Sequence, residues 1–351
     1  MGERDSCTDR PVAVLGAGNW GTTLAHLAAS NGRPVLLWTR DPRQREEINS
    51  ARSNSRGVPG LVLARGVRAV TDLGEALARP VLVIVAIPSQ AFREVCRAAG
   101  ELLAPEHLVV HATKGLERST HRRMTEVLLE ETCVRQIGVL SGPNIAAEIA
   151  AGKPAGTVVT SHFPRVVREC RRALSSPRLM VFAGDDIAGV ELAGAFKNVV
   201  AIAAGIAAEM QVGENAKALL LTRGLAEMAR LGTALGARPL TFAGLAGVGD
   251  LAVTCASAQS RNNRVGRALA RGEALPDILR QLGMVAEGVD AAASAHELAL
   301  AHSVDVPLMD QVFRVLYEGR SPSASLDELM RLWAGHDVGA SAGRSRASLL
   351  G

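Results

Sequence analysis

Lysine is scarce in this sequence, and its scarcity singles out four positions. Of the 39 lysines and arginines, the lysines are Lys114, Lys153, Lys197 and Lys217. An ammonium group gives up its proton far more readily than a guanidinium, so lysine suits proton transfer where arginine does not. Each of the four is therefore a candidate catalytic residue, although Lys153 and Lys217 could be chance survivors of the arginine bias.

Lys197 lies in the least polar part of the chain, residues 187–208. Every residue there is small or apolar except Glu191, Lys197 and Asn198. A helix that is apolar nearly all round is buried, and these three side chains argue against a membrane span because polar groups are costly in hydrocarbon. A buried lysine is a candidate acid or base. Small residues at helical spacing around it predict a groove that could admit a ligand: Ala193, Gly194, Val200, Ala201 and Ala204.

A second pattern with chemical meaning is Gly-Ala-Gly-Asn-Trp-Gly at residues 16–21. It follows an apolar strand predicted at 12–15, precedes a helix predicted at 22–29, and the next strand is predicted at 35–38. In this context Gly16 makes the tight turn, Gly18 lets the backbone approach a pyrophosphate, and Gly21 lets helix and strand pack closely. The pattern predicts a dinucleotide site, and the alternative is a glycine-rich turn without a ligand.

The end of the second predicted strand bears on which dinucleotide is used. It reads Thr39-Arg40-Asp41. An arginine there suits the 2′-phosphate of NADPH, and an acid suits the ribose hydroxyl of NADH. Because Arg40 comes first, we expect NADPH to be preferred, while Asp41 keeps NADH open and Arg40 could be a solvated loop charge.

Further apolar runs predict a mostly parallel sheet buried on both faces. They lie at residues 67–70, 81–86, 108–111, 137–140, 158–160 and 179–182. Lys114 and the segment Ser-Gly142-Pro-Asn144 directly follow two of these strands. Ligands bind at the carboxyl ends of such strands, so Lys114 is a candidate ligand for an anion or carbonyl, with a surface lysine as the alternative.

After residue 186 the strand pattern ends and helices are expected, at 214–231, 263–270, 291–300, 307–317 and 326–332. The fold class is therefore α/β, with an N-terminal Rossmann-like, mostly parallel sheet domain followed by an all-helical C-terminal domain. The predicted organisation is a flexible leader (1–10), a dinucleotide-binding domain (11–186), a helical substrate or catalytic domain (187–334) and a disordered tail (335–351).

One loop in the helical half is unlike a core segment. Residues 243–250 are glycine-rich and end at Asp250, and Ser260-Arg261-Asn262 follows. A guanidinium with serine and asparagine donors at a helix start suits a phosphate ester. The alternative is that Asp250 and Ser260 are helix caps.

Composition narrows the possible partners. The net charge is +4 and aromatics make up 3% of the chain, with no basic run interleaved with aromatic residues, so nucleic-acid binding is not expected. The five cysteines show no metal or redox spacing and are expected as free thiols in a reducing cytoplasm. The N-terminus shows no signal-peptide pattern and we expect no metal site. The sequence leaves the oligomeric state open, a homodimer included.

Eight ordered motifs across residues 11–333 resemble the NAD(P)-dependent glycerol-3-phosphate dehydrogenases of the bacterial type. They are Gly-Ala-Gly-Asn-Trp-Gly (16–21), Thr-Lys-Gly (113–115), Ser-Gly-Pro (141–143), Val-Glu-Leu-Ala-Gly-Ala-Phe-Lys-Asn (190–198), Thr-Arg-Gly-Leu-Ala-Glu-Met (222–228), Gly-Val-Gly-Asp-Leu (247–251), Ser-Arg-Asn (260–262) and Ala-Glu-Gly (286–288). The resemblance implies reversible reduction of dihydroxyacetone phosphate to sn-glycerol 3-phosphate, the backbone of phospholipids.

The resemblance also implies roles for individual residues. Lys197 becomes the catalytic acid or base, Lys114 a stabiliser of developing negative charge, and Asp250 the group that orients or balances the lysines. Substrate contacts are implied for Lys114, Gly142, Asn144, Lys197, Asp250, Ser260, Arg261 and Asn262. Beside the three glycines, cofactor contacts are implied for Asn19, Trp20, Arg40, Lys114, Ala146, Arg261, Val285 and Glu287.

The chain departs from the motifs of this family at two places, and two other functions remain as alternatives. Asn144-Ile145 stands where the family has Ser or Thr followed by Phe, and Glu214 stands where it has Asp. The first leaves the contact at position 144 in doubt. A hydroxyacid or phosphogluconate dehydrogenase of the same architecture is one alternative, and a dinucleotide-sensing module without turnover is the other.

Overall fold

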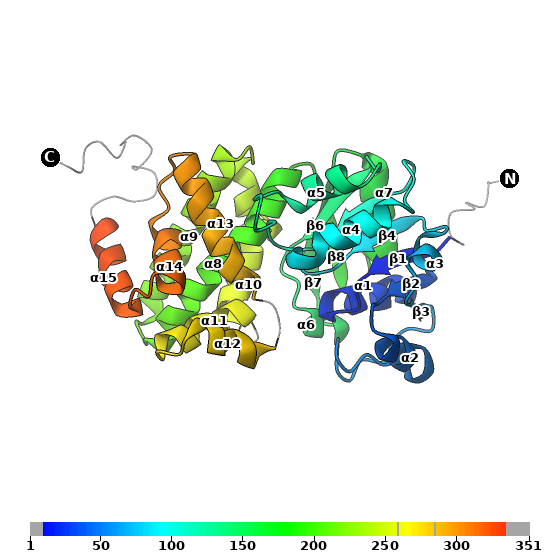
Figure 1. Ribbon diagram of the computed structural model, residues 1–351, viewed down its shortest axis with the longest axis horizontal. Helices are drawn as coiled ribbons and strands as arrows, with labels where there is room; N and C mark the ends of the chain where they lie inside the picture. Colours follow the sequence, from blue (N-terminus) through cyan, green and yellow to red (C-terminus); the bar gives the residue numbers. More distant parts are fainter. Residues whose placement is uncertain (1–9, 258–259, 284–285, 335–351) are drawn as a thin grey trace. The chain divides into compact units, whose positions relative to one another are not determined.

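The computed structural model describes residues 10–257, 260–283 and 286–334, and these form two compact units (Figure 1). The first unit comprises the described residues up to Ala195 together with Gly236–Asp250, and the second comprises Phe196–Leu235 and the described residues from Leu251 onward. This division differs from the predicted boundary at 186 in two ways: the first turns of the long helix and the loop 236–250 both pack with the sheet. The predicted leader, apart from Arg10, and the predicted tail lie outside the described residues.

The first unit is built on one sheet of eight strands in the order β3-β2-β1-β4-β5-β6-β7-β8. All neighbouring pairs are parallel except β6 with β7. The strands are β1 (Val12–Leu15), β2 (Val35–Trp38), β3 (Val67–Val70), β4 (Leu82–Val85), β5 (Val109–His111), β6 (Ile137–Ser141), β7 (Ala155–Ser161) and β8 (Leu179–Gly184). The predicted positions of β1, β2 and β3 are confirmed, and the other five strands differ from prediction only at their ends.

Helices cover both faces of the sheet, as expected for strands that are apolar along their whole length. In β1, Val12 and Val14 belong to one buried cluster and Ala13 and Leu15 to another, because successive side chains point to opposite faces. The helices are α1 (Asn19–Ser30), α2 (Pro42–Ala51), α3 (Leu73–Leu77), α4 (Phe92–Gly100), α5 (Met124–Glu131), α6 (Ala146–Ala150) and α7 (Pro164–Leu174), with short turns η1 (Ser89–Ala91), η2 (Pro239–Ala243) and η3 (Leu245–Gly249).

The described part of the second unit is entirely helical, which confirms the prediction. It holds the second part of α8 (Ile187–Glu209), nearly all of α10 (Asp250–Ala256), and α9 (Glu214–Ala234), α11 (Arg261–Ala270), α12 (Leu275–Leu282), α13 (Glu287–Ala301), α14 (Pro307–Tyr317) and α15 (Pro322–Leu332). Helices α8 and α11 cross almost backbone to backbone. A Cβ added to Gly205 would lie 2.1 Å from the Asn263 carbonyl oxygen, and one added to Gly266 would lie 2.0 Å from that of Ile202.

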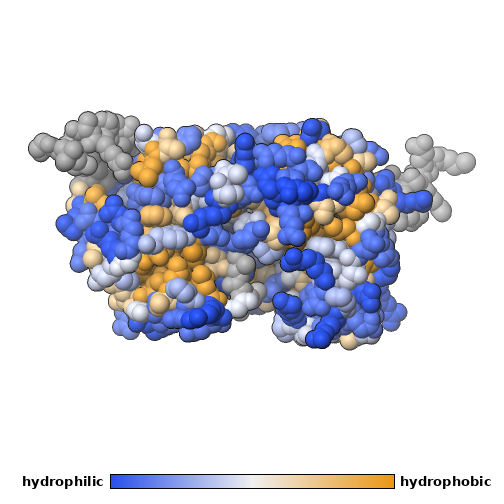
Figure 2. Space-filling view, viewed as in Figure 1, coloured by the Kyte–Doolittle hydropathy of each residue, from blue (hydrophilic) through white to orange (hydrophobic). Residues whose placement is uncertain are grey.

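Helix α8 is long and apolar enough to cross a membrane, the sole such helix among the described residues. However, 83% of its most apolar window is buried inside the protein, as in a core helix. The visible face of the molecule is mostly hydrophilic, with apolar residues in separate patches (Figure 2).

The start of α8 is anchored by a buried carboxylate, Glu191. It accepts hydrogen bonds from the Thr125 amide (2.8 Å) and hydroxyl (2.7 Å), and it pairs with Arg123 (2.9 Å) and His111 (3.1 Å). Burial opposes ionisation, but the contacts with His111, Arg123 and Thr125 outweigh it and lower the pKa of Glu191 from its ordinary value.

Glu227 on α9 is a second buried carboxylate, but here the effect of burial on the pKa is larger than the effect of the hydrogen bonds. It accepts from the backbone N–H groups of Leu308 (2.9 Å) and Met309 (3.1 Å) in the first turn of α14. Burial dominates over these two bonds and raises the pKa of Glu227 to about 8.

This raised pKa predicts a pH-dependent stability that the variant Glu227→Gln should lack. The folded state holds the proton more tightly than the unfolded state, whose carboxyl has a pKa near 4.5, so stability should fall as the pH rises from 4.5 to about 8. Melting temperatures of both proteins across this range measure the effect. The matched control is Glu214→Gln, an exposed glutamate on the same helix, which should keep the wild-type slope. Parallel curves for wild type and Glu227→Gln would contradict the assignment.

Candidate functional site

The glycine-rich turn after β1 has the geometry that its pattern predicts. Gly16 has φ of +111°, and a Cβ there would lie 2.5 Å from the Ala86 carbonyl oxygen. A Cβ on Gly21 would lie 1.9 Å from the Gly16 carbonyl oxygen. A Cβ on Gly18, in contrast, would meet nothing within 4 Å. The turn is thus closed on the protein side by Gly16 and Gly21 and has open space beside Gly18.

The start of α1 offers donors for an anion. Gly18 is the N-cap, no side chain caps the helix, and Asn19 is exposed in its first turn. The first N–H groups of an uncapped helix and its positive dipole end suit a phosphate. Within the described residues, the buried indole nitrogen of Trp20 also has no hydrogen-bond partner. The open space, the uncapped helix and this donor fit a dinucleotide.

Arg40 and Asp41, two and three residues beyond β2, are differently engaged. Asp41 caps α2 by accepting from the Arg43 amide (2.9 Å), and it pairs with Arg56 (3.5 Å). Arg40 is exposed and makes no ion pair within the described part of the chain. The carboxylate is therefore already in use, whereas the arginine is available to a 2′-phosphate.

Lys114 follows β5, and the structure brings it together with two other predicted residues. Its ammonium donates to Asp250 Oδ2 (2.6 Å) and to the Gly142 carbonyl oxygen (3.0 Å). Asp250 is buried, with 3% of its side chain exposed, against 19% for Lys114. Two of the three ammonium donors are used in this way, which leaves one for a ligand. Asp250 thus holds the Lys114 ammonium through a close ion pair.

The structure corrects one detail of the predicted groove along α8. A Cβ on Gly194 would lie 3.3 Å from Ser141 Oγ and 3.6 Å from Lys114 Cγ. The space beside Gly194 therefore holds the stem of Lys114 and the end of β6. Nearby, Asn144 donates to Thr157 (3.1 Å), while its buried Oδ1 has no partner within the described residues.

Lys197 is buried in the second unit, with 5% of the residue exposed. Its Nζ donates to Thr254 Oγ1 at 2.5 Å. Our sequence reasoning did not identify Thr254, although it lies four residues after Asp250 on α10. Because α10 carries both residues on one helical face, its spacing could have suggested that Thr254 serves a lysine as Asp250 does.

Two residues of the Ser-Arg-Asn segment, Ser260 and Asn262, make hydrogen bonds within the protein. Ser260 caps α11 by accepting from the Asn263 amide (3.3 Å), as the alternative interpretation proposed. Asn262 donates to Asn198 (2.9 Å) and accepts from the Gly288 amide (3.0 Å). One N–H of Asn262 remains for a ligand. Arg261, the first residue of α11, is exposed.

The remaining predicted positions are less distinctive. Ala146 and Glu287 are partly exposed first residues of α6 and α13. Val285 lies outside the described residues. Lys153 and Lys217 form surface ion pairs with Glu148 (3.0 Å) and Glu214 (2.8 Å), which supports the view that they are chance survivors.

The fold and the site together define a class of protein, the nucleotide-dependent dehydrogenases. The defining features are a mostly parallel sheet with a glycine-rich first turn, an uncapped first helix, and a helical unit that carries a buried lysine. Family models agree. The NAD-dependent glycerol-3-phosphate dehydrogenase N-terminus matches residues 11–166, and the C-terminus of the same family matches residues 186–327. The chain belongs to the NAD-dependent glycerol-3-phosphate dehydrogenase family.

Individual relatives are similar over nearly their whole length. The chain is 44% identical over 323 residues to a glycerol-3-phosphate dehydrogenase [NAD(P)+] of Geobacillus thermodenitrificans, covering 91% of this chain and 94% of the relative. It is 45% identical over 322 residues to that of Pseudomonas paraeruginosa, covering 92% and 94%. The crystal structure of glycerol-3-phosphate dehydrogenase from Coxiella burnetii has a TM-score of 0.88 at 36% identity, covering 92% of this chain and 99% of that one.

The exposure of Arg40 predicts a change in cofactor preference. In Arg40→Asp, the preference for NADPH over NADH should fall by about 1–3 kcal/mol, the worth of a charge-assisted contact. The ratio of kcat/KM for the two cofactors measures it. Arg79→Asp, which changes another exposed arginine of the same unit, should leave the ratio unchanged. An unchanged ratio in Arg40→Asp would make Arg40 a solvated loop residue.

Proposed function

We propose that this protein catalyses the reversible reduction of dihydroxyacetone phosphate to sn-glycerol 3-phosphate with NADPH or NADH, in the cytoplasm, for glycerophospholipid synthesis. The observation that carries the proposal is Lys197, a buried lysine held by a hydroxyl, in a chain of the glycerol-3-phosphate dehydrogenase family. NADPH is the preferred cofactor, because Asp41 is engaged in capping α2 and Arg40 is not.

The chemistry divides among the residues as follows. When bound, the nicotinamide supplies a hydride to the ketone carbon. Negative charge develops on the ketone oxygen, and Lys197 gives that oxygen its proton as general acid. Thr254 fixes the position of the Lys197 ammonium. Lys114, held by Asp250, supplies positive charge to stabilise negative groups of the substrate.

Recognition of the phosphate ester falls to the start of α11. Arg261 is exposed there, with a guanidinium suited to a phosphate. Asn262 keeps one N–H and is fixed by Asn198 and Gly288. Fixing the ester orients the reacting carbon, which is the usual source of specificity for a small ketone.

The same purified protein can be assayed for the two alternative functions, a related dehydrogenase activity and dinucleotide sensing without turnover. A panel of hydroxyacids and phosphogluconate separates this activity from that of related dehydrogenases, and loss of NADPH absorbance with dihydroxyacetone phosphate separates an enzyme from a sensing module. Sedimentation of the same sample tests the homodimer that the sequence left open.

The scarcity of lysine makes Lys197→Arg an informative variant. An arginine keeps the positive charge but hardly releases a proton, so kcat should fall by roughly 100- to 10,000-fold. The wild-type kcat for ketone reduction should decline with pH as the acid deprotonates, and the variant should lose this decline. NADPH binding, followed by fluorescence, should persist because the glycine-rich turn is unchanged. Lys217→Arg, a surface change of the same kind, is the control. Near-normal turnover in Lys197→Arg would move the acid role to Lys114.

A phosphate contact through Arg261 predicts a substrate-specific loss. Arg261→Ala should lower kcat/KM for dihydroxyacetone phosphate by about 10- to 100-fold or more, the worth of a hydrogen bond to a charged group. Unphosphorylated dihydroxyacetone should be an equally poor substrate for both proteins. Arg264→Ala, which removes the next exposed arginine on α11, should behave as wild type. Equal losses on both ketones would indicate a folding or cofactor defect instead.

A further inference from the structure

One short segment of this protein has a strong net positive charge and carries four arginines on the exposed face of a helix. Residues 163–180 hold five arginines and one glutamate and no other charged Asp, Glu or Lys side chain, which gives a net charge of +4. The whole chain has the same formal net charge of +4, so the charges of all other residues sum to zero, although residues 52–68 and 261–271 also hold four arginines each and no Asp or Glu. The segment consists of α7, the residues around it and the start of β8.

Helix α7 is amphipathic, and its apolar face is already used. Val166, Cys170 and Leu174, each 0% exposed, recur at a spacing of four and pack into the sheet core with Val181 of β8. Arg165, Arg168, Arg171 and Arg172 occupy the outer face of the helix and are exposed. The arginines therefore contribute nothing to the core.

Residues 163–180 contain one carboxylate, Glu169, and it is buried. Glu169, 4% exposed, pairs with Arg172 (3.1 Å), Arg33 (3.7 Å) and Arg168 (3.9 Å). Arg165 and Arg171 have no acidic partner within the described residues. The four arginines of the helix are exposed while Glu169 is buried, so the outer face of the helix is positive.

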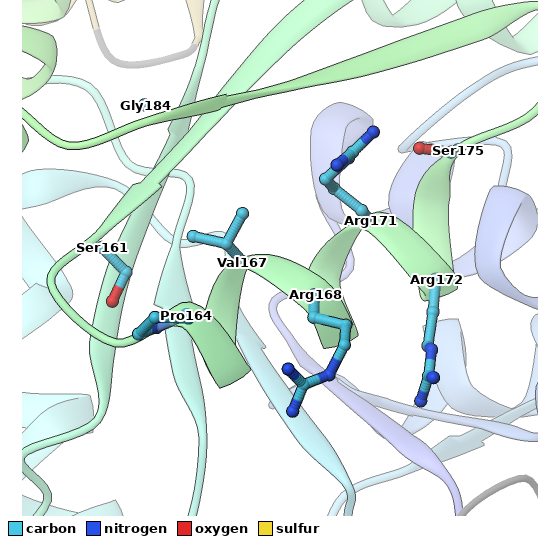
Figure 3. A pocket seen from close by; sticks show the side chains of 8 residues that line it. All are labelled: Ser161, Pro164, Val167, Arg168, Arg171, Arg172, Ser175 and Gly184. Atoms are coloured by element: carbon cyan, nitrogen blue, oxygen red, sulfur yellow. The ribbon is translucent and has the colours of Figure 1, made fainter.

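The guanidiniums do not converge on one point. Arg168, Arg171 and Arg172 line an open groove of about 680 Å³ together with Ser161, Val167 and Gly184. Figure 3 shows Arg168 and Arg172 projecting to one side of α7 and Arg171 to the other. A small anion would need donors that point to a common centre, so this arrangement fits an extended anionic surface.

We propose that α7 docks the protein on membranes rich in anionic phospholipid, whose phosphodiester groups face Arg165, Arg168, Arg171 and Arg172. Clusters of four to eight basic residues on a helix bind such surfaces. A nucleic acid is the weaker match, because the segment has one aromatic residue, Phe163, and none lies between Arg165 and Arg178 to stack on bases. Since the apolar face of α7 is buried in the protein, docking is electrostatic and the helix does not insert. Given the proposed function, docking releases the product beside the membrane whose lipids it helps to build.

The test is flotation of the full chain with vesicles of phosphatidylcholine alone or with about one-third phosphatidylglycerol. We expect binding to the anionic vesicles alone, in about 0.1 M salt, and its loss in about 1 M salt, where the Debye length falls from about 10 Å to about 3 Å. The triple variant Arg165→Gln, Arg168→Gln, Arg171→Gln keeps Arg172 as the partner of Glu169. It should bind about 100-fold more weakly and retain the kcat of wild type.

The matched control removes three exposed arginines from helices of the second unit: Arg280→Gln, Arg314→Gln and Arg331→Gln. It should bind anionic vesicles as wild type does. Absence of vesicle binding in low salt, or an equal loss in both triple variants, would overturn the proposal. Tighter binding to a single-stranded oligonucleotide at equal phosphate concentration would also overturn it. Because turnover with dihydroxyacetone phosphate is measured separately, failure of docking and failure of the proposed activity are distinguishable.

Discussion

The burial of α8 is the constraint on which the rest of the structure depends. This helix passes from one compact unit into the other, and it is apolar except where it carries Glu191, Lys197 and Asn198. A buried charge or amide is tolerated when hydrogen bonds replace water. Each of these residues has such partners within its own unit: Thr125 and Arg123 for Glu191, Thr254 for Lys197, and Asn262 for Asn198. Hydrogen bonds and ion pairs from neighbouring elements thus let α8 stay buried with its three polar side chains.

The two buried glutamates show why burial alone does not decide how an ionisable group behaves. Glu191 and Glu227 are both desolvated, yet the pKa of Glu191 is lowered and that of Glu227 is raised to about 8. Glu191 has a guanidinium and an imidazole beside it, whereas Glu227 has two backbone amides. The hydrogen bond from His111, together with the charges of His111 and Arg123, separates the two cases.

Sequence patterns predicted the fold well because they reflect local physics. The strands 12–15, 35–38 and 67–70 are short, mostly apolar runs that begin after a proline or glycine, and the spacing of Gly16, Gly18 and Gly21 fits the turn that follows β1. What the patterns missed depends on tertiary contacts. No local pattern indicates that residues 236–250 return to the sheet unit, or that Asn262 makes hydrogen bonds with Asn198 and Gly288. The spacing of Asp250 and Thr254 on one face of α10 suggests a shared role, but it does not show that Thr254 contacts Lys197.

The hydrogen-bonded pair Asn198 and Asn262 indicates how the second unit can combine proton transfer with recognition of a phosphate ester. Asn198 and Asn262 bond to each other, and Asn262 also receives the Gly288 amide, so α8, α11 and α13 are fixed together at these points. Lys197 directly precedes Asn198, and Arg261 directly precedes Asn262. A Cβ on Gly288 would lie 2.7 Å from the Asn198 carbonyl oxygen and 2.7 Å from Asn262 Oδ1, so the network is closely packed as well as hydrogen-bonded. The lysine and the arginine therefore extend from backbone positions that the network holds at a constant separation. Such pre-organisation lets the binding energy of a phosphate be used to orient the atom that receives the proton.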